Sequence, residues 1–250
     1  MSMAILDWWC QKEGISLFEY FGGKPDKTPQ TSFTISRGDM SFNPEKVAEA
    51  APYHILKIKL GMGEKQDKAI MNAIRAETDT LIRVDANEGW DLETGIKMCR
   101  WLAEQNVEFV EQPFKSSNLK DTATLRKQSP LPLVADENSL NSSDIPGIHG
   151  IFDGINIKLM KCGNLFEAQK MVTMARERDM TIMLGCMIES SVGITAAAHL
   201  SPLVDYADLD GNLLIINDPY KGVLVENGKL VLPQGNGLGV SLNSDQNHLK

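Results

Sequence analysis

Acidic and basic residues recur in this chain at the ends of short apolar runs. The recurring residues are Lys59, Asp85, Glu111, Asp136, Lys158 and Asp208, and the first five follow one another at intervals of 22 to 26 residues. Carboxylates that converge on one point repel each other unless a cation lies between them, and a set of hard oxygen ligands favours Mg²⁺. A solvated loop position is the competing interpretation for any single acid. Three acids that recur at the same regular interval favour a metal site.

The two lysines indicate acid–base chemistry beside that metal. A lysine has an ordinary pKa of about 10.4, which burial or a neighbouring cation can bring to about 7 to 8, the range of a useful base. Lys57 lies two residues before Lys59 and could supply that neighbouring charge. The competing interpretation is a surface lysine that protects the edge of a sheet. It would not apply if the strands close into a barrel, because a barrel has no open edge.

The elements that position these residues form a regular repeat. Strand-like runs occur at 32–35, 55–60, 81–85, 108–111, 133–136, 155–159, 181–185 and 206–209. Helical patterns lie between them at 44–51, 64–77, 92–104, 119–128, 165–178 and 191–200. Strand followed by helix, repeated eight times, predicts an α/β fold of the TIM-like (β/α)8 barrel type. In such barrels the site lies at the carboxyl ends of the strands.

Two segments stand outside the repeat and divide the chain into three parts. Residues 1–30 have a helical pattern, and residues 213–250 hold strand-like pieces at 213–216, 223–225 and 229–232. We therefore expect a flanking helical segment over 1–30, the barrel over 31–212, and a second flanking segment over 213–250.

This constellation resembles the enolase superfamily, specifically its muconate-lactonizing-enzyme subgroup. The resemblance rests on Lys57-Ile58-Lys59 at the second strand, on the three acids of strands three to five, and on Lys158 at the sixth. At the eighth strand, Asp208-Leu209-Asp210 resembles the Asp-x-Asp motif of the dipeptide epimerases, and the segment 185–191 is similar to their seventh strand end. Residues 1–30 resemble only the last helices of the family's α+β capping domain, most of which is absent. Residues 213–250 resemble the C-terminal segment that returns towards that domain.

The resemblance implies a Mg²⁺-dependent isomerase, an epimerase of dipeptides. Asp85, Glu111 and Asp136 would hold Mg²⁺, and Lys59 and Lys158 would exchange the α-proton of the C-terminal residue through an enediolate. The implied substrate-binding residues are Lys57, Thr34, Asn87, Met187, Glu189, Asp208 and Asp210. The last two would hold the α-ammonium of the dipeptide. The commonest substrate of such epimerases is L-Ala-D/L-Glu from peptidoglycan turnover.

Two alternatives remain open. A muconate cycloisomerase or an o-succinylbenzoate synthase of the same subgroup would use the same metal ligands and lysines, although the Asp208 and Asp210 pair would repel their dianionic substrates. A barrel fragment that binds Mg²⁺ or a small ligand without turnover is the second alternative, since the capping domain normally closes the site.

Composition excludes several other classes of function. The formal net charge of −8 disfavours nucleic-acid binding, and no apolar stretch reaches the roughly 18 residues of a membrane span. The N-terminus has no secretory pattern, and the four cysteines are scattered without a C-x-x-C pair. We therefore expect a cytoplasmic protein. The partner that the resemblance implies is a small-molecule dipeptide substrate, and a homo-oligomer is left open.

Overall fold

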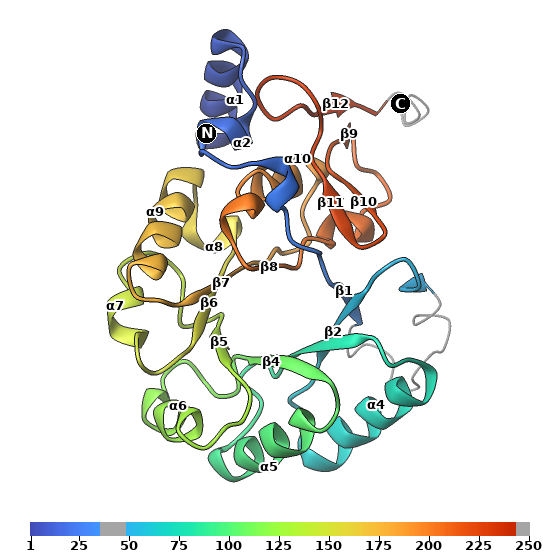
Figure 1. Ribbon diagram of the computed structural model, residues 1–250, viewed down its shortest axis with the longest axis vertical. Coiled ribbons are helices and arrows are strands. Elements are labelled where there is room, and N and C mark those ends of the chain that lie inside the picture. The colour runs from blue at the N-terminus through green and yellow to red at the C-terminus, as the bar shows by residue number, and fades with distance from the viewer. Residues whose placement is uncertain (36–48, 244–250) are drawn as a thin grey trace.

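Eight parallel strands, hydrogen-bonded in chain order, form the centre of the computed structural model, which describes residues 1–35 and 49–243. The strands are β1 (Phe33–Ile35), β2 (Ile55–Lys59), β3 (Leu81–Asp85), β4 (Val107–Glu111), β5 (Leu133–Ala135), β6 (Gly154–Ile157), β7 (Thr181–Leu184) and β8 (Tyr206–Ala207). The ring closes where Thr31 pairs in parallel with Ala207, whose carbonyl accepts a hydrogen bond from Ser32 N at 3.1 Å. In Figure 1 the strands surround the centre and the helices lie outside them. The predicted (β/α)8 class is confirmed.

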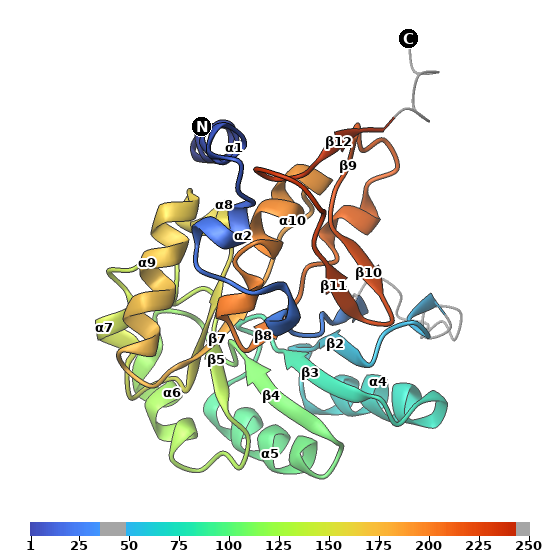
Figure 2. The same ribbon diagram turned by 45° about the horizontal axis from the view of Figure 1, so that its top comes forward.

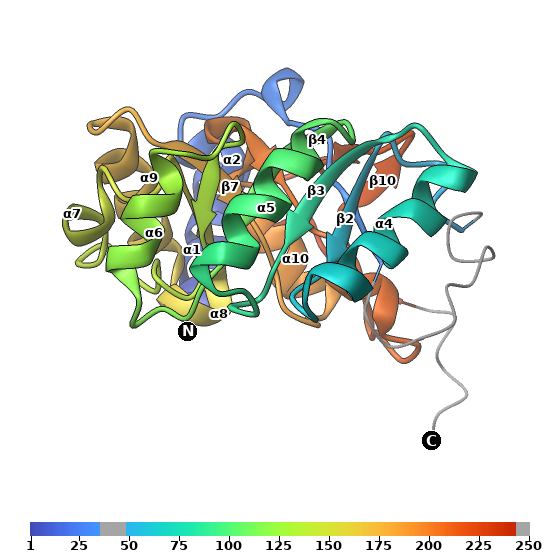
Figure 3. The ribbon, with the colours of Figure 1, turned by 90° about the horizontal axis from the view of Figure 1, so that it is seen from below.

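Helices follow the strands along the chain and cover the outside of the sheet. They are α4 (Glu64–Glu77), α5 (Leu92–Ala103), α6 (Leu119–Arg126), α7 (Ile145–Ile148), α8 (Leu159–Cys162), α9 (Leu165–Arg176) and α10 (Ser191–Ala198). Figure 3 shows α4 and α5 in front of strands β2 and β3. Side-chain caps fix two of the helix starts, since Asp91 accepts from Thr94 N at 2.8 Å and Asn164 accepts from Glu167 N at 2.9 Å. Most of the helix predicted at 44–51 lies outside the described residues.

Side chains that point into the barrel form two layers, a mainly apolar layer and a polar layer above it. Phe109, Val134 and Met183 form a small buried cluster in the interior, with Tyr206 packed against it. Arg83 lies over the Tyr206 ring, 4.8 Å from its centroid. Because side chains of period two share a face, residues two positions further along these strands form the next layer. That layer contains the recurring acids.

The strand register places acids of neighbouring strands side by side. Lys59 pairs with Asp85 across β2 and β3, and Asp85 pairs with Glu111 across β3 and β4. A register shift between Ile82 and Val84 precedes the second pairing and brings Asp85 opposite Glu111. Both carboxylates therefore leave the sheet at the same height.

The segments outside the repeat meet at one end of the molecule. The N-terminal elements are α1 (Ser2–Glu13), α2 (Leu17–Tyr20) and η1 (Pro25–Lys27). The later ones are η3 (Gly211–Leu214), β9 (Tyr220–Lys221), β10 (Leu224–Glu226), β11 (Lys229–Val231) and β12 (Ser241–Leu242), whereas η2 (Ser201–Leu203) lies within the repeat between α10 and β8. Asp7 of α1 accepts from Leu238 N at 2.8 Å, and Leu17 N donates to Gly237 O at 2.9 Å. Figure 2 shows α1 and the β9–β12 pair at the same end.

One predicted strand is wrong. Residues 213–216 were expected to be extended, but Gly211–Leu214 forms a 3₁₀ turn in which Leu213 N donates to Asp210 O at 3.0 Å. Leu214 is 65% exposed and Ile216 is 99% exposed. No strand of the described part of the chain covers this apolar run, so its composition resembled a strand without the pairing that makes one.

Among the described residues, no helix is long and apolar enough to cross a membrane.

Candidate active site

Three buried carboxylates meet at the mouth of the barrel. Asp85 ends β3, Glu111 ends β4, and Asp136 comes directly after β5. One oxygen of each lies within 4.8 Å of the others, and all three side chains are buried. A set of three anionic oxygen ligands without nitrogen or sulfur suits a hard divalent ion such as Mg²⁺. The donor set therefore fits the ion that the sequence implied.

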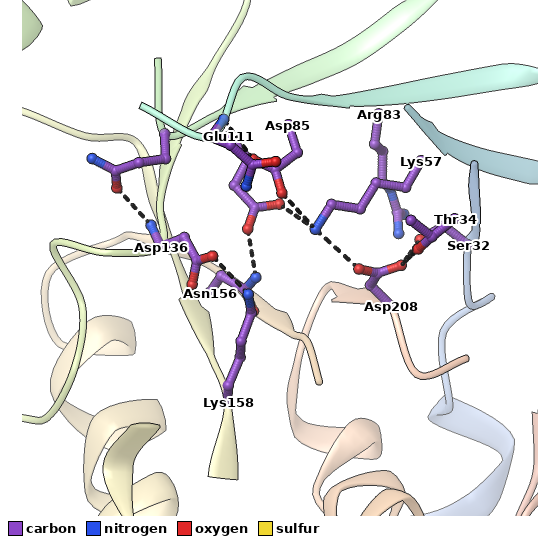
Figure 4. Close-up of polar contacts among 12 residues, drawn as sticks. Ser32, Thr34, Lys57, Arg83, Asp85, Glu111, Asp136, Asn156, Lys158 and Asp208 are labelled. Atoms are coloured by element: carbon purple, nitrogen blue, oxygen red, sulfur yellow. Dashed lines mark hydrogen bonds and ion pairs between the residues drawn. The ribbon is translucent and has the colours of Figure 1, made fainter. Parts of the chain in front are cut away.

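Lys57 occupies the middle of the acidic layer (Figure 4). Its Nζ lies 2.8 Å from Glu111 Oε2, 3.0 Å from Asp208 Oδ2 and 3.3 Å from Asp85 Oδ2. Burial lowers the pKa of Lys57, but attraction by these three carboxylates and by Asp136 outweighs it and holds the pKa well above its usual range. Lys57 is therefore a fixed cation rather than a base.

Burial and charge act in opposite directions on two of the acids. Burial raises the pKa of Glu111 to about 7; Lys57 opposes the shift and Asp85 adds to it. Burial also raises the pKa of Asp136, but the ammonium groups of Lys161 and Lys158 outweigh it and hold that pKa well below its usual range. Of these two acids, Glu111 is thus the one that needs an added cation to stay ionised near neutral pH.

The two candidate acid–base lysines differ in their surroundings. Lys158 Nζ lies 2.6 Å from Asp136 Oδ2 and the residue is 8% exposed. Burial lowers the pKa of Lys158, but Asp136 and Glu111 more than compensate, so its pKa is raised without a metal. This corrects the expectation that burial or a cation lowers it. Lys59 ends β2, on the strand four positions round the ring from β6, and is partly exposed.

The acids after β8 are tied to β1. Asp208 Oδ1 accepts from Ser32 Oγ at 2.6 Å and from Thr34 Oγ1 at 3.3 Å, while Asp210 Oδ2 accepts from Thr34 N at 2.7 Å. Burial raises the pKa of Asp210 to about 6, and the neighbouring Asp208 adds to the shift. The structure thus joins Thr34, Lys57, Asp208 and Asp210, four of the predicted substrate-binding residues, into one network.

The other three predicted substrate-binding residues lie on loops of the mouth. Asn87 N donates to Asp85 Oδ1 at 2.9 Å, so the loop after β3 turns back over this candidate metal ligand. Glu189 Oε1 accepts from Met187 N at 3.1 Å, and burial raises the pKa of Glu189. Met187 is 46% exposed. The two residues are held within their own loop and have no described bond to the carboxylates.

Sequence reasoning missed residues that contact the site. Ser32 bonds to Asp208, Asn156 Nδ2 donates to Glu111 Oε1 at 2.7 Å, and Gln112 Oε1 accepts from Asp136 N at 2.9 Å. Lys161 Nζ pairs with Asp136 Oδ1 and donates to Asp136 O at 2.6 Å. The signal available was proximity, since each lies within three residues of a predicted site residue in the chain or on an adjacent strand.

Comparison with known proteins identifies relatives over most of the chain. Residues 43–246 match the family model described as enolase C-terminal domain-like. An L-Ala-D/L-Glu epimerase of Bacteroides thetaiotaomicron is 46% identical over 229 residues, which are 91% of this chain and 59% of that protein. An L-Ala-D/L-amino acid epimerase of Flavobacterium johnsoniae is 37% identical, over 97% of this chain and 71% of that protein. This chain therefore spans about three fifths of the length of the first relative.

A solved structure supports the same grouping. The dipeptide epimerase of Cytophaga hutchinsonii, complexed with Mg and the dipeptide D-Ala-L-Val, superposes with a TM-score of 0.86 at 30% identity. The match covers 97% of this chain and 69% of that one. Overall shape and sequence thus agree on which proteins this chain is similar to.

Proposed function

Since this chain belongs to the enolase C-terminal domain-like family, we propose that it supplies the barrel of a Mg²⁺-dependent dipeptide epimerase. The observation that carries the proposal is the buried triad of Asp85, Glu111 and Asp136, placed between lysines of β2 and β6. The relatives are epimerases of L-Ala-D/L-Glu, of other alanyl dipeptides and of hydrophobic dipeptides. L-Ala-D/L-Glu is our first choice of substrate, because the relative at 46% identity bears that name.

In the proposed mechanism, each part of the site has one task. Mg²⁺ held by the triad would bind the carboxylate of the dipeptide and stabilise the negative charge that develops as the α-proton leaves. Lys59 and Lys158 stand on opposite sides of the ring, so one removes that proton and the other returns one to the opposite face. Epimerisation follows because the two faces are served by different lysines.

The eighth strand selects the substrate in this proposal. Asp208 and Asp210 present two carboxylates at the mouth, and an α-ammonium group would pair with them. Asp208 already faces Lys57, Ser32 and Thr34, so we assign the closer contact with the ammonium to Asp210. A cycloisomerase with a dianionic substrate would meet repulsion at this position, which favours the epimerase over that alternative.

The cell compartment and the organisation of the chain are parts of the same proposal. The four cysteines are free thiols, as is usual in the reducing cytoplasm, where dipeptides from peptidoglycan turnover would be processed. We retain residues 1–30, 31–212 and 213–250 as the flanking, catalytic and returning parts of the chain. Light scattering on a sizing column would show whether the chain forms a homo-oligomer.

Proton exchange tests the proposal directly. The chain is incubated in D₂O with Mg²⁺ and a set of L,L-dipeptides led by L-Ala-L-Glu, and ¹H NMR follows the α-proton of the C-terminal residue. We expect exchange that EDTA stops and that Lys59→Ala or Lys158→Ala abolishes. Exchange that persists in EDTA would reject the Mg²⁺-dependent mechanism. Absence of exchange with every dipeptide while Mg²⁺ binds would reject the epimerase and leave a barrel that binds a ligand without turnover.

A further inference from the structure

Asn156 holds one of the proposed metal ligands from the far side of the site. It lies on β6, is fully buried, and donates from Nδ2 to Glu111 Oε1 at 2.7 Å. The other carboxylate oxygen, Oε2, faces Lys57 Nζ at 2.8 Å. An ionised carboxylate only accepts hydrogen bonds, so the amide nitrogen and not the amide oxygen must point at Glu111. The two oxygens of Glu111 are therefore fixed from opposite strands (Figure 4).

The same amide leaves its oxygen without a donor. Asn156 Oδ1 is buried and has no hydrogen-bond partner among the described residues. Native proteins rarely bury a polar atom unpaired, and an exception calls for a reason other than packing. The reason available here is the bond on the nitrogen side, because an apolar residue in this position would pack without that cost but could not hold Glu111.

Gly185 makes room for the amide. It follows β7, beside β6, and a Cβ atom added to it would lie 2.6 Å from Asn156 Oδ1 and 2.7 Å from Nδ2. Those distances are shorter than any ordinary contact, so every residue other than glycine would displace the amide. Asn156 and Gly185 thus form a matched pair on adjacent strands.

The backbone of Asn156 reaches a second metal ligand. Its carbonyl accepts from Lys161 Nζ at 3.2 Å, and the same ammonium also donates to the carbonyl of Asp136 at 2.6 Å. Ser139 Oγ donates to the Asn156 carbonyl as well, at 3.1 Å. One residue of β6 is therefore joined to the ligands from β4 and β5.

We propose that Asn156 is a positioning residue of the metal site, seated by Gly185, which orients Glu111 for the ion. The inference rests on the proposed function, since it concerns the same triad. Residues that orient metal ligands typically change metal affinity by about 10- to 100-fold when they are replaced. Asn156 touches neither the substrate nor the ion in this scheme, and its side chain acts through Glu111.

Metal binding measured by calorimetry tests the pair. The Mg²⁺ dissociation constant is determined for the full chain and for Asn156→Leu, Gly185→Ala and Glu111→Gln, with folding checked by circular dichroism. Gly154→Ala is the matched control, because a Cβ there would press on Thr181 Oγ1 at 2.2 Å on the same pair of strands without touching the amide. We expect Asn156→Leu and Gly185→Ala each to weaken Mg²⁺ binding about 10- to 100-fold. Gly154→Ala lowers the melting temperature and leaves the dissociation constant within about twofold.

Saturation with metal separates positioning from damage to the barrel. If Asn156 acts through Mg²⁺ affinity, excess Mg²⁺ restores most of the proton-exchange rate of Asn156→Leu, whereas a distorted barrel stays inactive. Where Asn156→Leu does not fold, Gly185→Ala decides, because it retains every polar group. Normal Mg²⁺ affinity in Gly185→Ala would overturn the inference while the triad stands. Failure of the parent chain to bind Mg²⁺, or unchanged binding in Glu111→Gln, would instead remove the proposed metal site itself.

Discussion

Lys57 Nζ lies 2.8 Å from Glu111 Oε2 and 3.0 Å from Asp208 Oδ2, so a single buried ammonium joins the proposed metal ligands to the proposed amine-binding acids. Its side chain is 3% exposed, and both partners are buried. In this position the lysine neutralises part of the charge that the carboxylates would otherwise bury unpaired. The barrel can therefore fold before an ion is present.

Replacing Lys57 by methionine tests this role. Removal of one partner from a buried ion pair leaves uncompensated charge, and we expect Lys57→Met to lower the free energy of unfolding in EDTA by about 3–5 kcal/mol. Mg²⁺ should restore a larger share of stability in this variant than in the parent, because it supplies the missing positive charge. Urea unfolding with EDTA and with Mg²⁺ measures both quantities.

An exposed lysine gives the matched control for that experiment. Lys97 pairs with Glu93 at 2.7 Å on the surface of α5, and an exposed helical pair of this kind contributes little to stability because solvent screens it. Lys97→Met should therefore hardly change the unfolding curve, with or without Mg²⁺. Equal losses in the two variants would contradict the role assigned to Lys57.

Much of this arrangement could be predicted from the sequence, because strand periodicity alone brings residues of equal phase to one end of a barrel. Asp85, Glu111 and Asp136 stand at the ends of strands recognisable by their apolar runs, and they meet as that pattern requires. The contacts of Asn156 and Lys161 could not be predicted. They depend on the register between β4, β5 and β6, and residue spacing along one strand carries no information on register.

At residues 213–216 the sequence predicted a strand that does not form, and Gly211–Leu214 is a 3₁₀ turn. Its apolar residues resemble a strand, but a strand is defined by a neighbour that accepts its hydrogen bonds, and none lies there among the described residues. The pKa of Lys158 was mispredicted for a similar reason. Burial was foreseen, whereas the 2.6 Å contact with Asp136 that reverses its effect is a tertiary feature.

The response to Mg²⁺ should depend on pH through Glu111. Burial raises its pKa to about 7 in the metal-free fold, above the usual value of about 4.3 in an unfolded chain. Between these two values the unfolded chain releases a proton that the folded chain retains, so the metal-free protein loses stability as the pH rises through this window. Mg²⁺ requires the ionised carboxylate, so its stabilising effect grows over the same window.

Thermal unfolding at two pH values measures this effect. The rise in melting temperature produced by excess Mg²⁺ should be larger near about pH 8 than near about pH 5.5. Glu111→Gln removes the titrating group, and its remaining response to Mg²⁺ should be small and independent of pH. An equal Mg²⁺ response of the parent chain at the two pH values would contradict the assignment of Glu111 as a ligand.

Asp210 predicts a different pH dependence, on the substrate side. Burial and Asp208 raise its pKa to about 6, so at saturating Mg²⁺ the kcat/KM for a dipeptide with a free amine should fall as the pH drops through that value. A hydrogen bond between charged groups contributes about 1.5–3 kcal/mol, so Asp210→Asn should lower kcat/KM roughly 10- to 150-fold and remove this limb of the profile. An N-acetylated dipeptide is the control, since it should be an equally poor substrate for both proteins.

Asp67 should stabilise the loops that follow β2 and β3 at the mouth of the barrel. It is fully buried at the start of α4, where Oδ2 accepts from Gly61 N at 3.0 Å and from Trp90 Nε1 at 2.7 Å, and Oδ1 accepts from Met62 N at 3.0 Å. One carboxylate thus joins the loop that follows Lys59 to the loop that follows Asp85. Asp67→Ala would leave three donors unpaired, and we expect it to lower the free energy of unfolding by about 2–4 kcal/mol.

Asp67→Asn removes only part of the hydrogen bonding between this side chain and the two loops. An asparagine keeps one acceptor oxygen and replaces the other by a donor that faces an N–H group, so at least one of the loops is released. We expect a smaller loss of stability than in Asp67→Ala and a fall in proton exchange, because the loop beside Lys59 no longer has a fixed position. Urea unfolding and D₂O exchange measure the two effects, with the exposed Glu64→Gln on the same turn as the control. A loss of stability in Asp67→Asn without any change in exchange would show that this carboxylate supports the fold and not the position of Lys59.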